Sequence, residues 1–268
     1  MGKLQLVSTG AGGSRYLTNE AIVAIEEADL VVGYTKYIKD LKEYLVDKDT
    51  YTSGMTKEIE RATYAIESAK EGKSVVLISN GDANVYAMGS LVVELLDVKG
   101  YWDDIEYISL AGITSVLALA SEVGAPLSQD FCLISLSDRL TDFNLIQKRI
   151  ELSIECDFVI AIYNPKSRSR LDPYRGFLDK LSKVEDDRVV VVARDLGRGE
   201  KQYIDITTAK ELISKGVENE NVNMSTTILV GNSTTKLTSN GKVLTPRGYL
   251  SKYDLSGDKK DEWRATNN

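Results

Sequence analysis

The chain has 268 residues, of which 43% are hydrophobic, so it can bury the core of one large domain or of two modest ones. Its formal net charge of −7 argues against non-specific binding to nucleic acid or to anionic membranes, since both are polyanions. It contains no histidine, which excludes Ser-His-Asp and Cys-His nucleophilic catalysis and histidine-ligated zinc.

The first 118 residues alternate short apolar strands with helices. We expect strands at residues 3–8, 30–33, 75–79 and 105–110. Helices are expected at residues 18–28, 38–44, 56–71, 85–96 and again after 115, with Thr18 as the first N-cap. In the third helix the apolar side chains recur at helical spacing, at Ile59, Ala62, Ala65, Ile66 and Ala69. This rhythm predicts a mostly parallel sheet covered by helices.

The remainder of the chain has a different texture. We expect strands at residues 131–135, 158–163, 189–193, 203–207 and 226–230, with helices at 144–155 and 174–183. Only a short helix separates the last two strands, which predicts an antiparallel component. The prediction is therefore an α/β protein with two domains, an N-terminal one (1–118) with a mostly parallel sheet and a C-terminal one (119–250) with a mixed sheet. Residues 251–268 are expected to be a flexible tail.

The cysteines and the apolar runs bear on where the protein works. Cys132 and Cys156 lie in apolar stretches, which indicates two reduced core thiols rather than a disulfide or a metal site. No apolar run approaches the roughly 20 residues of a membrane span. We therefore expect a cytoplasmic protein.

The most informative stretch is the apolar run Val75–Ser79, which leads into Asn80, Gly81 and Asp82. A run of this length, rich in β-branched residues, predicts a strand buried on both faces. In open α/β sheets, ligands bind outside the carboxyl ends of the strands, where Gly81 and Asp82 would lie. An acidic side chain there suits a polar or cationic small molecule. Asp82 can equally cap the helix that follows, so both roles remain open.

Two further turns follow strands in this half of the chain. Ser8-Thr-Gly-Ala-Gly-Gly13 lets backbone approach a ligand closely, although an ordinary tight turn explains it equally well. It lacks both the G-x-G-x-x-G spacing of a dinucleotide fold and the closing Lys-Ser/Thr of a P-loop. The other turn offers the hydroxyl groups of Thr114 and Ser115, which can also be helix caps. Because parallel strands end at one sheet edge, we expect all three turns to line one crevice.

Short segments spread from residue 3 to about residue 250 carry the most specific signal. The two most specific are Ile134-Ser-Leu-Ser-Asp138 and Tyr163-Asn-Pro-Lys-Ser167. The chain resembles the tetrapyrrole methylase family, the class III S-adenosylmethionine-dependent methyltransferases, and within it the precorrin-3B C17-methyltransferase and cobalt-factor III methyltransferase group. The other supporting segments are 10–18, 32–37, 53–55, 81–86, 124–127, 130–131, 226–232 and 245–249.

The resemblance implies two α/β domains with a ligand crevice between them, usually in a homodimer. It implies C17 methylation of a precorrin or cobalt-factor III tetrapyrrole, coupled to ring contraction, in cobalamin biosynthesis. The implied methyl donor is S-adenosyl-L-methionine, with S-adenosyl-L-homocysteine as the product. The residues implied to line the site of this donor are Ala11, Asn80, Gly81, Asp82, Val85, Thr114, Ser115 and Asn164.

A tetrapyrrole with acetate and propionate side chains requires a local cationic rim on this acidic protein. The planar fork of arginine suits carboxylates, so cationic residues in expected loops are the candidates for substrate binding. They are Arg139, Lys166, Arg168, Arg170 and Arg194, with Arg198 and Arg247 as further candidates. Ring contraction needs proton movement, for which the catalytic candidates are Asp138, Asp130 and Tyr163. Methyl transfer from a sulfonium needs alignment and desolvation, so no metal ligands are expected.

The chain departs from the family pattern at the turns themselves. The family usually has proline where this chain has Ala11, Ala83 and Ala111, and glycine where it has Ser8. Each loss of a proline frees φ and costs about 0.4–1 kcal/mol of pre-organisation. Two alternatives to the expected enzyme therefore stay open. One is a degenerate, non-catalytic homologue that binds a tetrapyrrole, and the other is a methylase of the same class with a different tetrapyrrole acceptor.

Overall fold

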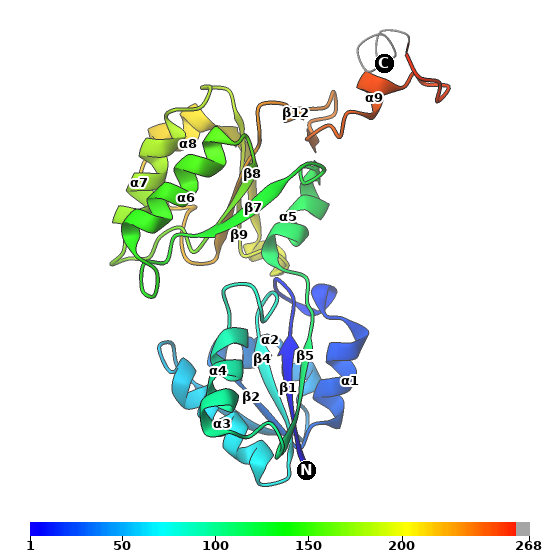
Figure 1. The fold of residues 1–268 in the computed structure, drawn as a ribbon, viewed down its shortest axis with the longest axis vertical. Coiled ribbons are helices and arrows are strands. Elements are labelled where there is room, and N and C mark those ends of the chain that lie inside the picture. The colour runs from blue at the N-terminus through cyan, green and yellow to red at the C-terminus, as the bar shows by residue number, and fades with distance from the viewer. Residues whose placement is uncertain (261–268) are drawn as a thin grey trace. The chain divides into compact units, whose positions relative to one another are not determined.

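The computed structural model describes residues 1–260, which divide into two compact units (Figure 1). Unit 1 comprises Met1–Leu119 together with Asp195–Tyr203, and unit 2 comprises Ala120–Arg194 and the chain from Ile204 onward. The division after Leu119 lies one residue from the boundary expected from the sequence. The assignment of Asp195–Tyr203 to unit 1 was not expected. Within the described residues, no helix is both long and apolar enough to cross a lipid bilayer.

Unit 1 is built on a five-stranded sheet with the order β3-β2-β4-β1-β5. Every neighbouring pair in it is parallel, as predicted. The sequence analysis did not identify β3, because its residues DTYTS are polar and mostly exposed at the edge of the sheet. The strands are β1 (Gly2–Ser8), β2 (Leu30–Tyr34), β3 (Asp49–Ser53), β4 (Ser74–Ser79) and β5 (Ile105–Leu110).

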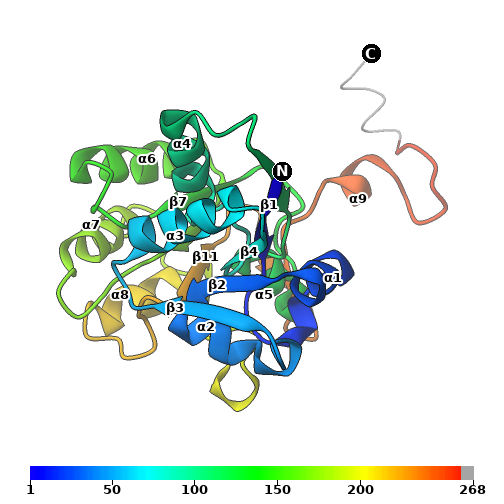
Figure 2. The same ribbon diagram turned by 90° about the horizontal axis from the view of Figure 1, so that it is seen from below.

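The sheet of unit 1 has an apolar core on each face. In β4, Val75 and Leu77 pack into one core, while Val76 and Ile78 pack into the other. Successive side chains of a strand point to opposite faces, so the continuous apolar run of β4 is buried on both sides, as predicted. Figure 2 shows helices on both sides of this sheet. The helices of this unit are α1 (Asn19–Glu27), α2 (Thr35–Asp40), α3 (Glu58–Lys70), α4 (Gly89–Lys99) and α5 (Ser115–Val123), whose last turn enters unit 2.

The predicted N-cap of α1 is confirmed, and so is the predicted buried face of α3 except at one residue. The Thr18 side chain accepts a hydrogen bond from the backbone N–H of Ala21, so Thr18 is the N-cap of α1, as predicted. In α3, Ala62, Ala65, Ile66 and Ala69 are fully buried. Ile59 is 65% exposed, contrary to its place in the apolar pattern. It is the second residue of α3, which begins at Glu58.

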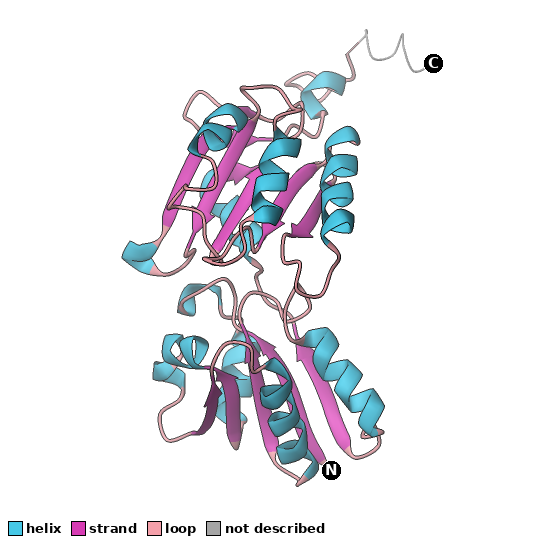
Figure 3. Cartoon of the chain, turned by 90° about the vertical axis from the view of Figure 1, so that its left-hand side faces the viewer, coloured by secondary structure: helices cyan, strands magenta, loops and turns pink. Residues whose placement is uncertain are grey.

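Unit 2 contains a five-stranded mixed sheet with the order β10-β9-β11-β8-β7 (Figure 3). The strand β7 pairs with β8 in parallel, whereas β11 is antiparallel to both β8 and β9. The predicted antiparallel component is therefore present, but β10 and β11 are not neighbours in the sheet. The strands are β7 (Phe131–Ser135), β8 (Val159–Tyr163), β9 (Val189–Arg194), β10 (Tyr203–Thr208) and β11 (Thr226–Val230), and the helices are α6 (Phe143–Glu155), α7 (Asp172–Leu181) and α8 (Ala209–Lys215).

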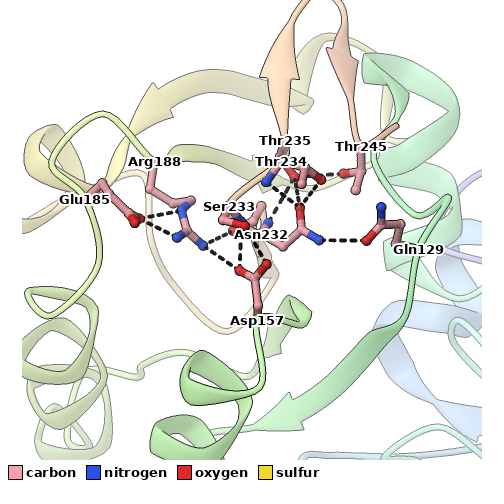
Figure 4. A network of polar contacts seen from close by, with 10 residues as sticks. Gln129, Asp157, Glu185, Arg188, Asn232, Ser233, Thr234, Thr235 and Thr245 are labelled. Atoms are coloured by element: carbon pink, nitrogen blue, oxygen red, sulfur yellow. Dashed lines mark hydrogen bonds and ion pairs between the residues drawn. The ribbon is translucent and has the colours of Figure 1, made fainter. Parts of the chain in front are cut away.

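A network of polar side chains follows β11 in unit 2 (Figure 4). The buried Asn232 donates through Nδ2 to Gln129 Oε1 at 3.2 Å and accepts from Thr235 Oγ1 at 3.1 Å. Asp157 accepts two hydrogen bonds from Ser233, from its N–H at 2.8 Å and from its hydroxyl at 2.6 Å. Because its buried polar atoms are paired, the network can hold the chain in place without a desolvation penalty. It leads into a small sheet of β6 (Gly124–Ala125), β12 (Lys236–Leu237) and β13 (Val243–Leu244).

The structure also bears on the expected burial of the two cysteines and on the expected C-terminal tail. Cys132 is half-buried and donates to Ser153 Oγ at 3.3 Å, but Cys156 is exposed, because α6 ends beside it. In the expected tail, residues 251 and 252 end α9 (Tyr249–Lys252), and residues 253–260 form a hydrogen-bonded turn with a bridge between Tyr253 and Lys259. The rest of that tail lies outside the described residues.

The two isoleucines of α3 test this account of the core. We expect Ile66→Ala to lower the free energy of unfolding by about 2–5 kcal/mol, because it opens a cavity between α3 and the sheet. The matched control Ile59→Ala should change it by less than about 0.5 kcal/mol, since that side chain is exposed. Equilibrium denaturation of both variants is the measurement, and similar losses would contradict the assignment of α3's buried face.

Candidate functional site

The turns after β1, β4 and β5 meet at one edge of the sheet in unit 1, as predicted. These three strands are neighbours, with β1 in the centre. The first two turns are joined by a pair of backbone hydrogen bonds between Gly10 and Gly81, of 3.1 Å and 2.6 Å. Both glycines have φ near +70°, a conformation that costs a side-chain-bearing residue energy. The glycines are therefore required by the turns themselves, whether or not a ligand is bound.

Asp82 connects the second turn to the third. Its Oδ2 accepts a hydrogen bond from the N–H of Gly112 at 2.9 Å, and its Oδ1 accepts one from the N–H of Asn84 at 2.8 Å. Hydrogen bonds to an ionised carboxylate are about twice as strong as neutral ones. Asp82 thus holds two turns in place, a role that the sequence analysis did not include. Each oxygen keeps a lone pair, so the predicted contact with a ligand is still possible.

The helix after this turn begins later than predicted. We expected it near Val85, but α4 begins at Gly89. Asp82 closes a local turn onto Asn84, and Tyr86 has a φ of +53°, which right-handed helix cannot accommodate. Asp82 is therefore not the N-cap of α4. The extra turn places Asn84 and Val85 at the sheet edge rather than in the helix.

The alanine at position 83 makes a contact that a proline could not make. Its N–H donates to Ser8 Oγ at 2.8 Å, and both residues are completely buried. Proline has no N–H, and glycine has no hydroxyl, so the bond requires both departures from the family pattern. A Cβ on Gly112 would collide with Ser8 Cβ and with the carbonyl oxygen of Gly81, so the third turn packs directly on the other two. The turns without prolines are thus locked by hydrogen bonds and close packing.

The structure distributes the predicted cofactor residues between the two units. Ala11 and Thr114 are buried and Ser115 begins α5, while the N–H of Val85 donates to the carbonyl of Asp82 at 3.0 Å. With Asn80, Gly81 and Asp82 they all belong to the strand-end turns of unit 1. The remaining predicted residue, Asn164, belongs to unit 2. All of these cofactor contacts stay predictions.

The segment Asp195–Tyr203 adds residues to this edge that the cofactor prediction missed. Arg198 donates through Nη2 to Asn80 Oδ1 at 3.3 Å and to Asp40 Oδ2 at 3.4 Å. A small cavity of about 10 Å³, room for about one water molecule, lies beside it. Its lining includes Tyr37, whose phenol pKa is raised by burial. The complete lining is Thr9, Gly12, Gly13, Tyr37, Asp40, Leu41 and Asn80.

In unit 2, the two segments most specific to the family group lie side by side after β7 and β8. The N–H of Leu136 donates to the carbonyl of Tyr163 at 2.9 Å, and Asn164 Nδ2 donates to Ser135 Oγ at 3.0 Å. Asn164 has a φ of +51°, which asparagine tolerates better than most residues. The structure thus brings the predicted Tyr163 and Asn164 to one strand edge.

Arg170 holds this second edge together. Its guanidinium donates to the carbonyls of Leu136 and, at 2.8 Å, of Asn164, and its Nε lies 3.8 Å from Asp138 Oδ1. The side chain is only 11% exposed. Arg170 therefore joins the two segments through hydrogen bonds to their backbone carbonyls, and its ion pair places Asp138 next to them. Arg194, at the end of β9, is likewise engaged, with Asn221 Oδ1 at 3.1 Å.

Lys166 differs most from its predicted role. It is buried, and its Nζ donates to the carbonyls of Val217 and, at 2.9 Å, of Asn219. Burial lowers the pKa of this ammonium group below its usual value. Because its ammonium group donates to the backbone carbonyls of Val217 and Asn219, Lys166 stabilises the loop that contains them. Arg139 and Arg168 are exposed and have no hydrogen bond or ion pair with another described residue.

The acidic candidates do not form one cluster. Asp138 follows β7, whereas Asp130 precedes it, at the opposite end of the strand. At about 3.3 Å per residue, the five residues of β7 separate the two positions by roughly 16 Å. Arg170 connects Asp138 to Asn164, the residue after Tyr163, whereas Asp130 lies apart from them. Within residues 1–260, no three acidic or cysteine side chains are grouped so that they could hold a metal ion.

The hydrogen bond between Ser8 and Ala83 can be tested with a double-mutant cycle. Ala83→Pro alone removes the donor and puts the ring Cδ against Ser8 Oγ, so we expect it to cost about 1–3 kcal/mol of unfolding free energy. Adding Ser8→Gly removes the clash and the unpaired hydroxyl, and should recover much of that loss. Equilibrium denaturation of the four proteins measures the coupling. Strictly additive effects would show that the two positions do not interact.

Comparison with known proteins places the chain. The sequence model of the tetrapyrrole (corrin/porphyrin) methylases matches residues 3–213. Relatives named probable cobalt-factor III C(17)-methyltransferase are each 40% identical, from Methanocaldococcus jannaschii (94% of this chain, 100% of the relative) and from Salmonella typhimurium (92% and 99%). The crystal structure titled as the methyltransferase CobJ matches with a TM-score of 0.83 and 34% identity, over 92% of this chain and all of that one.

Two longer relatives match over only 46% and 56% of their own length, so the likeness covers one part of those proteins. In the M. jannaschii and S. typhimurium relatives it covers the whole. The family resemblance inferred from the sequence is therefore confirmed, as is the two-part α/β fold with its parallel and mixed sheets. The chain belongs to the tetrapyrrole methylase family.

Proposed function

We propose that this chain is an S-adenosylmethionine-dependent methyltransferase that methylates C17 of a cobalt-factor III or precorrin-3B tetrapyrrole in cobalamin biosynthesis. The observation that carries the proposal is the 40% identity to relatives so named, over 94% of this chain and the full length of one relative. The two segments most specific to this group support it further, because they form one hydrogen-bonded edge in unit 2.

The residues of unit 1 fit the methyl donor. Gly10, Ala11 and Gly81 are buried in the turns at the sheet edge, and they support the site by fixing its backbone rather than by direct contact with a ligand. The carboxylate of Asp82 lies at this edge and can balance the positive charge of a sulfonium. Asn80 adds an amide that can fix the orientation of the ligand. S-adenosylmethionine, when bound, supplies a methyl group, which an electron-rich ring carbon attacks in line with the bond from methyl to sulfur as that bond breaks.

The locked turns explain why this chain can work without the family's prolines. The bonds from Ala83 to Ser8 and from Gly112 to Asp82 hold the three turns in one arrangement. Preformed turns lose little freedom when a ligand binds, so we expect the loss of the prolines to cost little affinity. This argues for the enzyme over the degenerate, non-catalytic alternative.

In unit 2, we propose that Asp138 moves the proton that ring contraction requires. Its carboxylate is held beside Tyr163 and Asn164 by Arg170, and Oδ2 is the oxygen left for a substrate proton. Asp130 is the weaker candidate, because it lies at the other end of β7. For the acetate and propionate groups of the tetrapyrrole, we propose the exposed Arg139 and Arg168, whose guanidinium groups are free to form bidentate contacts.

The family resemblance also supports a homodimer. Light scattering coupled to size-exclusion chromatography tests it, and a monomeric mass at micromolar concentration would contradict it.

The activity itself is tested with labelled S-adenosylmethionine and candidate precorrins. We expect the label in the tetrapyrrole at C17, with a contracted ring, after mass analysis of the product. Methylation of uroporphyrinogen instead would favour the methylase with a different acceptor. Binding of S-adenosylhomocysteine with no methylation of any tetrapyrrole would favour the non-catalytic homologue.

The different roles of Arg168 and Lys166 give a separate prediction. Arg168→Ala should raise KM for the tetrapyrrole about tenfold, the equivalent of about 1.4 kcal/mol, with unchanged S-adenosylhomocysteine affinity and thermal stability. Lys166→Met should instead lower the melting temperature, because it leaves two backbone carbonyls without a donor. Enzyme kinetics and thermal unfolding measure both variants. A Lys166→Met protein with unchanged thermal stability and a raised KM would contradict this assignment and would indicate that Lys166 binds the substrate.

A further inference from the structure

Arg198 lies against the strand-end turns of unit 1, although its sequence position is in the second half of the chain. Its side chain is only 13% exposed. The guanidinium reaches Asn80 Oδ1 at 3.3 Å and Asp40 Oδ2 at 3.4 Å through Nη2, and Asp195 Oδ1 at 3.8 Å through Nη1. The two aspartates balance its charge. Arg198 is therefore a neutralised, largely buried donor group at the edge where β4 ends.

The backbone around Arg198 is fitted closely to the glycine-rich turn after β1. A Cβ on Gly12 would come within 2.6 Å of the carbonyl oxygen of Leu196, and one on Gly13 within 2.5 Å of that of Gly197. The same added atom on Gly12 would also lie 3.1 Å from Arg198 Cγ. The two glycine-rich loops thus touch through their backbones, which leaves Arg198 little room to move.

The chemistry of this contact determines how the Asn80 side chain is turned. An arginine has five N–H donors and no acceptor, so only the oxygen of the Asn80 amide can face it. The amide oxygen and nitrogen lie on opposite sides of the group. Nδ2, which donates to no other described residue, is therefore the end that remains available. Asn80 also helps to line the small cavity beside Thr9 and Tyr37.

We propose that Arg198 is a positioning residue that turns Asn80 so that its Nδ2 donates to an acceptor-only atom of the bound ligand, a carboxylate oxygen or a ring nitrogen. The inference rests on the proposed function, because it takes the ligand to be the methyl donor or its product. It adds a residue from the second half of the chain to the machinery of the strand-end turns. It also assigns Asn80 a direction, as a donor and not as an acceptor.

The variant Asn80→Asp separates the two contacts of this side chain. A carboxylate at position 80 can still accept from Arg198, and this charged hydrogen bond offsets the repulsion from Asp40, which contacts the same Nη2. We therefore expect a melting temperature close to that of the wild type. The ligand would then meet an acceptor in place of a donor, and the dissociation constant for S-adenosylhomocysteine should rise at least tenfold. Asn19→Asp, an exposed asparagine in the first turn of α1, is the matched control for the change in charge and should bind as wild type does.

Substitutions of Arg198 complete the experiment. Arg198→Ala frees the amide to turn over and should weaken S-adenosylhomocysteine binding about three- to tenfold. Arg198→Lys can reach Asn80 Oδ1 and should restore part of the affinity. A merely structural role for Arg198 would lower the melting temperature in both variants without this partial rescue of binding.

Isothermal titration calorimetry with S-adenosylhomocysteine gives the affinities, and thermal unfolding gives the stabilities. Unchanged or tighter binding by Asn80→Asp, with wild-type protein binding normally, would overturn the inference and leave the proposed function intact. Absence of wild-type binding at millimolar S-adenosylhomocysteine would overturn the proposed function, and this inference with it.

Discussion

The carboxylate of Asp82 is the contact on which the candidate site of unit 1 depends. Its Oδ1 accepts a hydrogen bond from the N–H of Asn84, within the turn after β4. Its Oδ2 accepts one from the N–H of Gly112 and so joins this turn to the turn after β5. The pair of backbone bonds between Gly10 and Gly81 then adds the turn after β1. Three loops from three strands are thereby fixed to one another before any ligand arrives. A site that is already ordered loses little entropy on binding, and that is how loops can serve as a precise surface.

The same arrangement includes a restraint at Ala83, one of the three positions where the family usually has proline. A proline restrains a loop by limiting its unfolded conformations, whereas a hydrogen bond restrains it by favouring the folded one. The serine at position 8 and the alanine at position 83 form such a bond, and neither residue could form it with the usual family partner. The two departures from the pattern therefore compensate each other. The missing proline is thus accompanied by a buried hydrogen bond that restrains the same turn in the folded state.

The two units handle charge in different ways. In unit 1, Arg198 is neutralised by two aspartates and turned toward an amide. In unit 2, Arg170 and Lys166 donate hydrogen bonds mainly to backbone carbonyls. Cations buried in this way organise loops, because an unpaired buried charge would be costly. Arg139 and Arg168 are exposed instead, so a protein with an excess of acidic residues still presents cationic side chains on its surface.

The sequence by itself determined most of the strands of the two larger sheets, the burial of β4, the cap at Thr18 and the family, because these follow from local patterns and short sequence motifs. It missed β3, a polar strand at the edge of its sheet. It did not determine that α4 begins at Gly89, that Lys166 is buried or that Arg198 lies against the turns of unit 1. Those facts depend on backbone bonds and close contacts between residues far apart in the chain, such as Gly12 with Leu196. Only the tertiary structure brings such residues together, since packing decides which donor meets which acceptor.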